Sequence, residues 1–134
     1  MFAFRKNVND WDANSLVAVP TTSTQTPTLT VAQFFANFID FASSAGGGIT
    51  LTTPTVAQIL AALPATVPQN GFNYTMTILN DNTGQTITVA AGANVTLVGA
   101  SATIATNVAR TYLVNINVGA GTVTMISVGS GQAL

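Results

Sequence analysis

The sequence predicts a mainly β fold: a single antiparallel β-sandwich or barrel-like domain with one or two short helices and an extended N-terminal arm. From Gly71 onward, apolar residues recur at every second position, which is the period of a half-buried strand. Clusters of Asn, Asp and Gly separate these segments about every 8–12 residues, a spacing typical of sandwiches and barrels. A chain of 134 residues can bury one such core.

We divide the chain into an extended arm over residues 1–28, a β-rich domain over residues 29–128 and a loose C-terminal tail over residues 129–134. The arm holds four of the seven charged residues and the only Trp. Chain ends are commonly poorly ordered, so a floppy terminus is one interpretation. We favour an arm that lies on a partner or a neighbouring subunit, because its large apolar side chains would otherwise face water.

A short internal repeat predicts two helices. Thr30-Val31-Ala32-Gln33 recurs as Thr55-Val56-Ala57-Gln58, with the spacing of a capping box. We therefore expect short helices near residues 31–42 and 56–63. The first would carry large apolar residues on more than one face and be mostly buried, either in the core or against another subunit. These residues are Phe34, Phe35, Phe38, Ile39 and Phe41.

Strands are expected in one segment between the helices and throughout the second half of the chain. Their ranges are 48–53, 72–78, 85–90, 94–99, 101–106, 110–118 and 121–128. In the segment 84–99, the alternation places Ile87, Val89, Val95 and Leu97 inward and Thr86, Thr88 and Thr96 outward. Residues 80–84 should form a turn, because Asn, Asp and Gly tolerate the positive φ that hairpins need.

The composition is poor in charge. The sequence has 22 Thr and no Glu, His or Cys. Its charged residues are Arg5, Lys6, Asp10, Asp12, Asp40, Asp81 and Arg110. A typical soluble domain has about a quarter of its residues charged, and mixed surface charge keeps molecules apart. The surface is either polar without being ionic or largely covered by copies of itself or a partner. We favour the second interpretation, because strand edges without charges invite pairing.

The same composition argues against several functions. Three basic residues make no basic patch, so we expect no nucleic-acid binding. Apolar runs stop well short of the ~20 residues of a membrane span, so we expect no membrane partner. Without His or Cys and with few carboxylates, we expect no metal and no cofactor.

Catalysis is also a poor fit. Asp40 and Asp81 are the only carboxylate pair outside the arm, and their spacing does not suit glycoside hydrolysis. Ser and Thr nucleophiles have no base beside them. We therefore expect the protein not to be an enzyme. Arg110 could pair with Asp81 or Asp40 to fix strand register, or it could contact a partner.

Three segments resemble a module found in tailed-bacteriophage structural proteins: Thr75–Asn80, Gln85–Gly92 and Val95–Gly99. The two Thr-Val-Ala-Gln segments are similar to the start of that module, and the resemblance covers roughly residues 28–128. Such modules occur in capsid decoration (cement) proteins, head fibres and tail-fibre or receptor-binding regions. The resemblance implies a virion component that is usually homo-oligomeric.

Among these roles we expect a capsid decoration protein. It would bind the outside of a phage head as a dimer or trimer, contact the major capsid protein of the same virion and stabilise the shell. It would lie on the outer surface of the virion after assembly in the host cytoplasm. The alternative is a tail-fibre or head-fibre module that binds a host surface receptor, and a small glycan hydrolase is a third possibility. Candidate partner contacts are Phe2, Phe4, Arg5, Trp11, Leu16, Val17, Phe35, Phe38 and Arg110.

Overall fold

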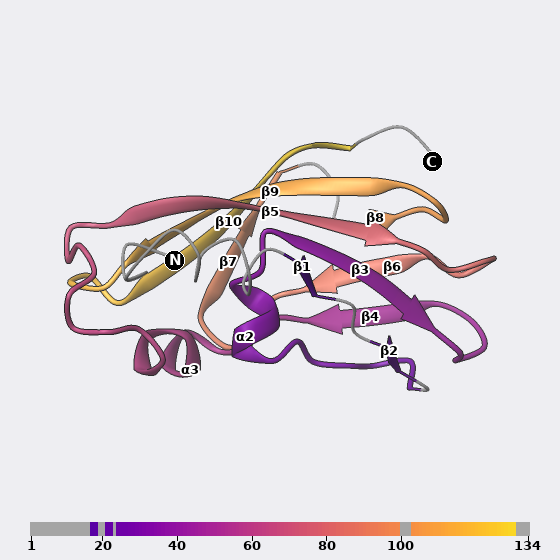
Figure 1. Ribbon diagram of the computed structural model, residues 1–134, viewed down its shortest axis with the longest axis horizontal. Helices are drawn as coiled ribbons and strands as arrows, with labels where there is room; N and C mark the ends of the chain where they lie inside the picture. The colour runs from indigo at the N-terminus through magenta and orange to yellow at the C-terminus, as the bar shows by residue number, and fades with distance from the viewer. Residues whose placement is uncertain (1–16, 19–20, 23, 100–102, 131–134) are drawn as a thin grey trace.

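Two β-sheets pack together, with two short helices beside the smaller sheet (Figure 1). The computed structural model describes residues 17–18, 21–22, 24–99 and 103–130. Within these residues, the larger sheet has the strand order β1-β3-β5-β9-β10-β7, with β2 also beside β3, and the smaller sheet has the order β4-β6-β8. The mainly β, sandwich-like class predicted from the sequence is confirmed.

The larger sheet is built from segments distributed along the whole described chain. Its strands are β1 (Val17–Ala18), β2 (Thr21–Thr22), β3 (Phe38–Ser43), β5 (Phe72–Asn80), β7 (Val95–Val98), β9 (Ala109–Asn117) and β10 (Thr122–Ser130). The strands of the smaller sheet are β4 (Ile49–Thr52), β6 (Ile87–Ala90) and β8 (Thr103–Ile104). All seven strands expected from residue 48 onward are present.

Both sheets are mixed, so the expectation of purely antiparallel pairing is wrong. β5–β9, β9–β10 and β6–β8 are antiparallel, whereas β1–β3, β2–β3, β3–β5, β7–β10 and β4–β6 are parallel. Parallel neighbours need a crossover connection. The chain makes one between β3 and β5 by passing through β4 in the other sheet and then a helix. This alternation between sheets gives no local signal in the sequence.

The two predicted capping boxes are confirmed, but one helix is shorter than expected. In α2 (Val31–Phe34) and α3 (Val56–Ala61), the Thr30 and Thr55 hydroxyls accept from the amides of Gln33 and Gln58, whose side chains accept from the Thr amides in return. Helix α2 ends after one turn, so the predicted helix over residues 31–42 is wrong beyond that turn. Residues 38–43 form β3 instead, because β5 on one side and β1 and β2 on the other supply strand partners.

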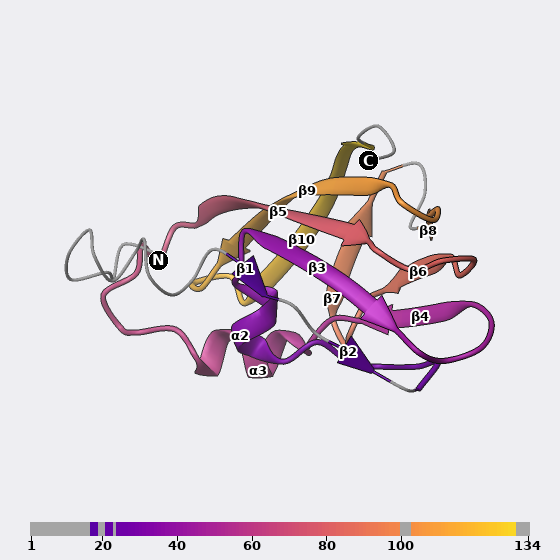
Figure 2. The same cartoon turned by 45° about the vertical axis from the view of Figure 1, so that its right-hand side comes forward.

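The core lies between the two sheets, and the helices extend the layer of the smaller sheet toward one end of the molecule (Figure 2). Side chains of the larger sheet that point into it are Ile39, Phe41, Met76, Ile78, Tyr112, Val114, Ile116, Val123 and Met125. The smaller sheet and the helices contribute Ile49, Leu51, Ile87, Val89, Ile104, Phe34, Val56 and Ile59. The predicted alternation in residues 84–99 is confirmed: Ile87, Val89 and Val95 are buried, Leu97 is half-buried, and the three Thr residues are exposed.

The described part of the predicted arm pairs with its own chain. β1 and β2 lie along β3, and residues 25–29 lie along β4. Three backbone bonds join the latter pair: Leu29 N–H to Thr52 O (2.8 Å), Thr50 N–H to Gln25 O (2.7 Å) and Thr52 N–H to Pro27 O (3.0 Å). Residues 1–16 lie outside the described residues. The predicted loose tail over residues 129–134 is wrong at its start, because Gly129 and Ser130 belong to β10.

Gly92 packs directly on the backbone that leads into α3. Its amide donates to the buried Thr53 hydroxyl (2.8 Å), and a Cβ at this position would overlap the carbonyl oxygens of Thr53 and Pro54. A Cβ at Gly46 would meet nothing within 4 Å. Gly92 therefore fixes how closely the β6–β7 turn approaches this segment.

We predict that Gly92→Ala lowers the free energy of unfolding by about 1–3 kcal/mol, the usual cost of overpacking a closely packed site. Urea denaturation followed by circular dichroism measures this. The matched control, Gly46→Ala, should stay within roughly 0.5 kcal/mol of wild type, as surface substitutions usually do. Equal stability of the two variants would contradict the assigned role of Gly92.

Candidate interaction surface

The described residues carry three charged side chains, Asp40, Asp81 and Arg110, and these form no ion pair with one another. Arg110 on β9 donates to the Ser127 hydroxyl of β10 (2.9 Å) and to the Thr103 carbonyl of β8 (3.1 Å). Of the two roles considered for Arg110, pairing with Asp40 or Asp81 is not found among the described residues, because its acceptors there are a hydroxyl and a carbonyl. Arg110 instead braces β8, β9 and β10 through uncharged acceptors, which links the two sheets.

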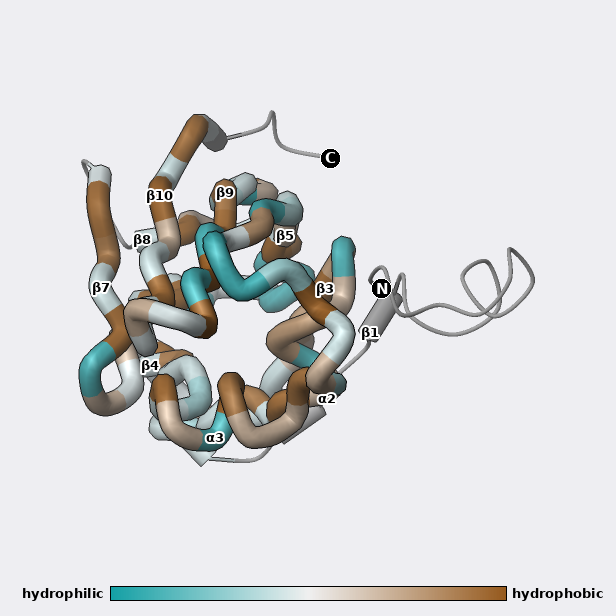
Figure 3. Tube along the Cα trace, turned by 90° about the vertical axis from the view of Figure 1, so that its left-hand side faces the viewer, coloured by the Kyte–Doolittle hydropathy of each residue, from teal (hydrophilic) through white to brown (hydrophobic). Residues whose placement is uncertain are grey.

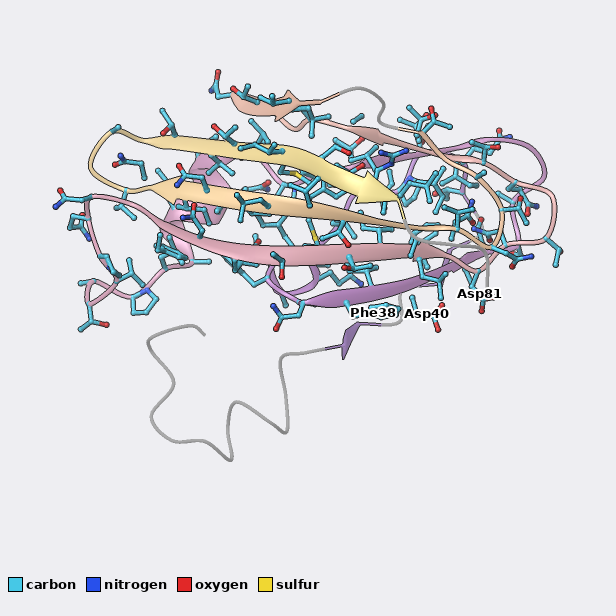
Figure 4. The ribbon with its side chains drawn as sticks, turned by 90° about the horizontal axis from the view of Figure 1, so that it is seen from above. Phe38, Asp40 and Asp81 are labelled. Carbon is cyan, nitrogen blue, oxygen red and sulfur yellow. The ribbon has the colours of Figure 1, made fainter. Side chains whose placement is uncertain are left out.

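The two described carboxylates come from different elements. Asp40, expected on the exposed edge of a helix, lies half-buried on β3 beside Phe38, and Asp81 follows β5 in an exposed turn (Figure 4). One Asp40 oxygen, Oδ1, is buried without a hydrogen-bond partner, whereas the Asp81 amide donates to the Phe41 carbonyl (3.0 Å). The described residues contain no group of three or more His, Cys, Asp or Glu side chains that could hold a metal ion.

Neither described helix has the length and apolar character needed to cross a bilayer. Most groups on the described surface are hydroxyls, amides and backbone edges, with a few apolar side chains. On the larger sheet these groups form ordered rows.

We define the outer face as the side of the larger sheet that is turned away from the smaller sheet, which is the side seen in Figure 4. Strand register aligns its side chains in rows across β5, β9, β10 and β7. One row is Asn73–Asn115–Thr124–Thr96, and the next is Thr75–Leu113–Ile126–Val98. On these four strands the outer face carries no charged side chain, and Asp40 on β3 is the one described charge beside them.

The polar members of the outer face hydrogen-bond to one another across strands. Asn115 Nδ2 donates to Asn73 Oδ1 (2.7 Å), and the hydroxyls of Thr77 and Thr111 lie 2.8 Å apart. Cross-strand pairs of this kind stabilise a sheet by about 0.2–1 kcal/mol each. They also hold the polar groups in place without ions, so a partner can cover them without desolvating charges.

Apolar side chains continue the outer face toward β7. Leu113 and Ile126 are half-buried, while Val98 and Val128 are 48% and 56% exposed and are the exposed large hydrophobic residues of the described chain. The register places Ile126 directly beside Val98. Single exposed apolar residues are ordinary, so the feature that distinguishes this end of the outer face is the continuous row of Leu113, Ile126 and Val98.

The predicted partner contacts are only partly brought together. Phe2, Phe4, Arg5, Trp11 and Leu16 lie outside the described residues. Val17 of β1 pairs in register with Phe38 of β3. Phe35 lies elsewhere, half-buried beside Phe34 and Tyr74, with ring centroids 5.7 and 5.8 Å away. Arg110 already donates to two acceptors within the fold. Its role as a partner contact stays a prediction.

Two sets of residues could not be identified from the sequence. The rows of the outer face depend on strand register, which the alternation alone does not give. The second set is the buried side-chain amides of Asn80 and Asn82. The sequence predicts a turn with positive φ over residues 80–84, but among these residues only Gly84 has a positive φ. Asn80 instead donates through Nδ2 to the carbonyls of Gln85 (2.8 Å) and Ile104 (2.9 Å), which ties the turn to β8.

Comparison of the chain with protein-family models, with curated protein sequences and with solved structures finds no match.

Burial disfavours the ionised form of both tyrosines of the chain. Tyr112 is 2% exposed beneath the outer face, and its hydroxyl has no hydrogen-bond partner. Burial raises its pKa from 10.0 to about 12, with a smaller opposing effect of the Arg110 charge. Burial also raises the pKa of Tyr74 well above its ordinary value, and its hydroxyl donates to the Phe34 carbonyl (2.7 Å).

We predict that the free energy of unfolding falls as the pH rises between 10 and about 12. The unfolded tyrosines lose their protons near pH 10, whereas the folded ones keep them, so rising pH favours unfolding. For Tyr112 alone, a pKa raised from 10.0 to about 12 corresponds to roughly 3 kcal/mol. Urea denaturation across this pH range measures the effect.

The control for this prediction is Tyr112→Phe. It should lose less stability at high pH and be at least as stable as wild type at neutral pH, because it removes a buried hydroxyl that has no partner. Stability that stays constant from pH 10 to 12 in the wild-type protein would contradict the assignment.

Proposed function

We propose that this protein is a virion structural component, a capsid decoration protein that binds the outside of a phage head and stabilises the shell. It acts as a homo-oligomer whose partners are other copies of itself and the major capsid protein of the same virion. The observation that carries the proposal is the outer face of β5, β9, β10 and β7, which has no charged side chain and where paired Asn and Thr side chains lie beside apolar ones. The resemblance to modules of tailed-bacteriophage structural proteins is the reason that we propose a phage particle as the site of attachment.

An uncharged, hydrogen-bonded face suits attachment to a repetitive shell. Burying ions costs free energy that their pairing often fails to recover, whereas hydroxyls and amides that are already paired cost less to cover. Each contact then contributes little by itself. Many copies on one shell, and several subunits in one oligomer, raise the overall strength of attachment through effective concentration.

The alternative, a head-fibre or tail-fibre module that binds a host surface receptor, would place the protein elsewhere on the particle or leave the outer face free of the shell. Immunogold labelling of purified particles separates these roles. The decoration proposal expects label over the head at high copy number. Label confined to the tail would support the fibre alternative.

We predict that Thr75→Lys weakens binding to capsid shells at least tenfold. Thr75 is exposed in the middle of the outer face, and a lysine there would be buried without a partner in the complex. Cosedimentation of the purified protein with shells measures binding. Thr88→Lys is the matched control, because Thr88 is exposed on β6 of the smaller sheet and should tolerate the change. Equal binding by the two folded variants would contradict the proposal.

A further inference from the structure

The described strand edges are covered to different degrees. β1 and β2 cover the edge of β3, and residues 25–29 cover the edge of β4 through backbone hydrogen bonds. β8 is two residues long, and the carbonyl of Thr103 accepts from Arg110. Within the described part of the chain, β7 is the last strand of the larger sheet and pairs on one side only, with β10. Figure 3 places β7 and β1 at opposite sides of the molecule.

The β7 edge lacks the features that normally prevent strand addition. Natural edge strands are protected by lysines, prolines, bulges or inward-pointing charges. β7 has the sequence Val-Thr-Leu-Val over residues 95–98, and its register with β10 is regular over all four residues. Thr96 and Val98 are exposed, and β10 beside them carries no charged residue either.

We propose that the β7 edge binds the β7 edge of a second copy of this chain, so that one sheet runs through both molecules. A twofold axis at this edge makes the two strands antiparallel, which is the more stable pairing per residue. Directly opposed residues then share a face. Thr96 and Val98 meet their counterparts on the outer face, and Val95 and Leu97 meet theirs on the core side.

A second copy fits this edge better than other partners. The free backbone N–H and C=O groups of a strand edge are matched by another strand. A partner that recognises charge finds none on β7 or β10, whereas a like strand can approach without repulsion. The described part of the N-terminal arm is already paired at the edges of β3 and β4. The exposed Val98 would gain apolar cover from the partner strand.

The proposal gives a molecular basis for the self-association that the proposed function assumes, but its test needs no capsid. Sedimentation velocity of the full chain should show a dimer or a larger oligomer at micromolar concentration. Thr96→Lys and Thr96→Glu should each weaken this association at least tenfold, because like charges would lie close together across the twofold axis. An equimolar mixture of the two variants should associate again through opposite charges.

The control is Thr88→Lys, which adds the same charge on a strand that has neighbours on both sides and should associate like wild type. Circular dichroism and thermal unfolding confirm that each variant is folded. The proposal is overturned by a wild-type monomer at about 100 μM, by Thr96 variants that associate like wild type, or by a mixture that stays monomeric. Deletion of residues 1–16 should leave association intact, and its loss would assign the contact to the arm instead.

The two proposals can fail separately. Thr75 lies on β5, which β9 and β10 separate from β7, so Thr75→Lys should still form the dimer but no longer bind shells. A wild-type dimer sensitive to Thr96→Lys, combined with no binding to shells, would sustain the β7 contact and refute the decoration role.

Discussion

The covering of sheet edges is the constraint on which the rest of this structure depends. A mixed sandwich exposes the backbone of each outer strand, and this chain uses its own N-terminal segment to cover two of them, β3 and β4. That requirement explains why β1 and β2 lie along β3 and why residues 25–29 lie along β4. It also explains why residues 38–43 are a strand, because they lie between β5 on one side and β1 and β2 on the other. No described segment covers the outer edge of β7, and this is the edge at which we propose pairing with a second copy.

Hydrogen bonds to uncharged acceptors connect the described strands. Arg110 donates to a hydroxyl on β10 and a carbonyl on β8, Asn80 ties a turn to β8, and Asn and Thr pairs cross-link the outer face. The Asn and Thr groups carry no charge, so they add order without adding long-range repulsion. The same choice leaves a surface with little to keep molecules apart. The composition therefore underlies both the hydrogen bonds within the fold and the self-association that we propose.

Much of the fold could be predicted from the sequence because its signals are local. The capping boxes at Thr30 and Thr55 and the two-residue alternation of Ile87 and Val89 depend only on neighbours in the chain, and all are confirmed. The extent of α2 could not be predicted, because clustered Phe residues suit either a buried helix or a strand, and distant partners decide. Parallel pairing and the rows of the outer face depend on register between segments far apart in sequence. The outer face was therefore expected only as a charge-poor surface, without its residues.

We propose that this charge-poor architecture leaves the β7 edge free to join two molecules together. Hydrogen–deuterium exchange measured at several protein concentrations tests this proposal, since an amide paired across an interface exchanges more slowly as the complex forms. We expect amides of residues 95–98 to exchange more slowly as concentration rises, while amides of β4 and β6 in the smaller sheet do not change. Concentration-independent exchange at residues 95–98, or new protection confined to other segments, would contradict it.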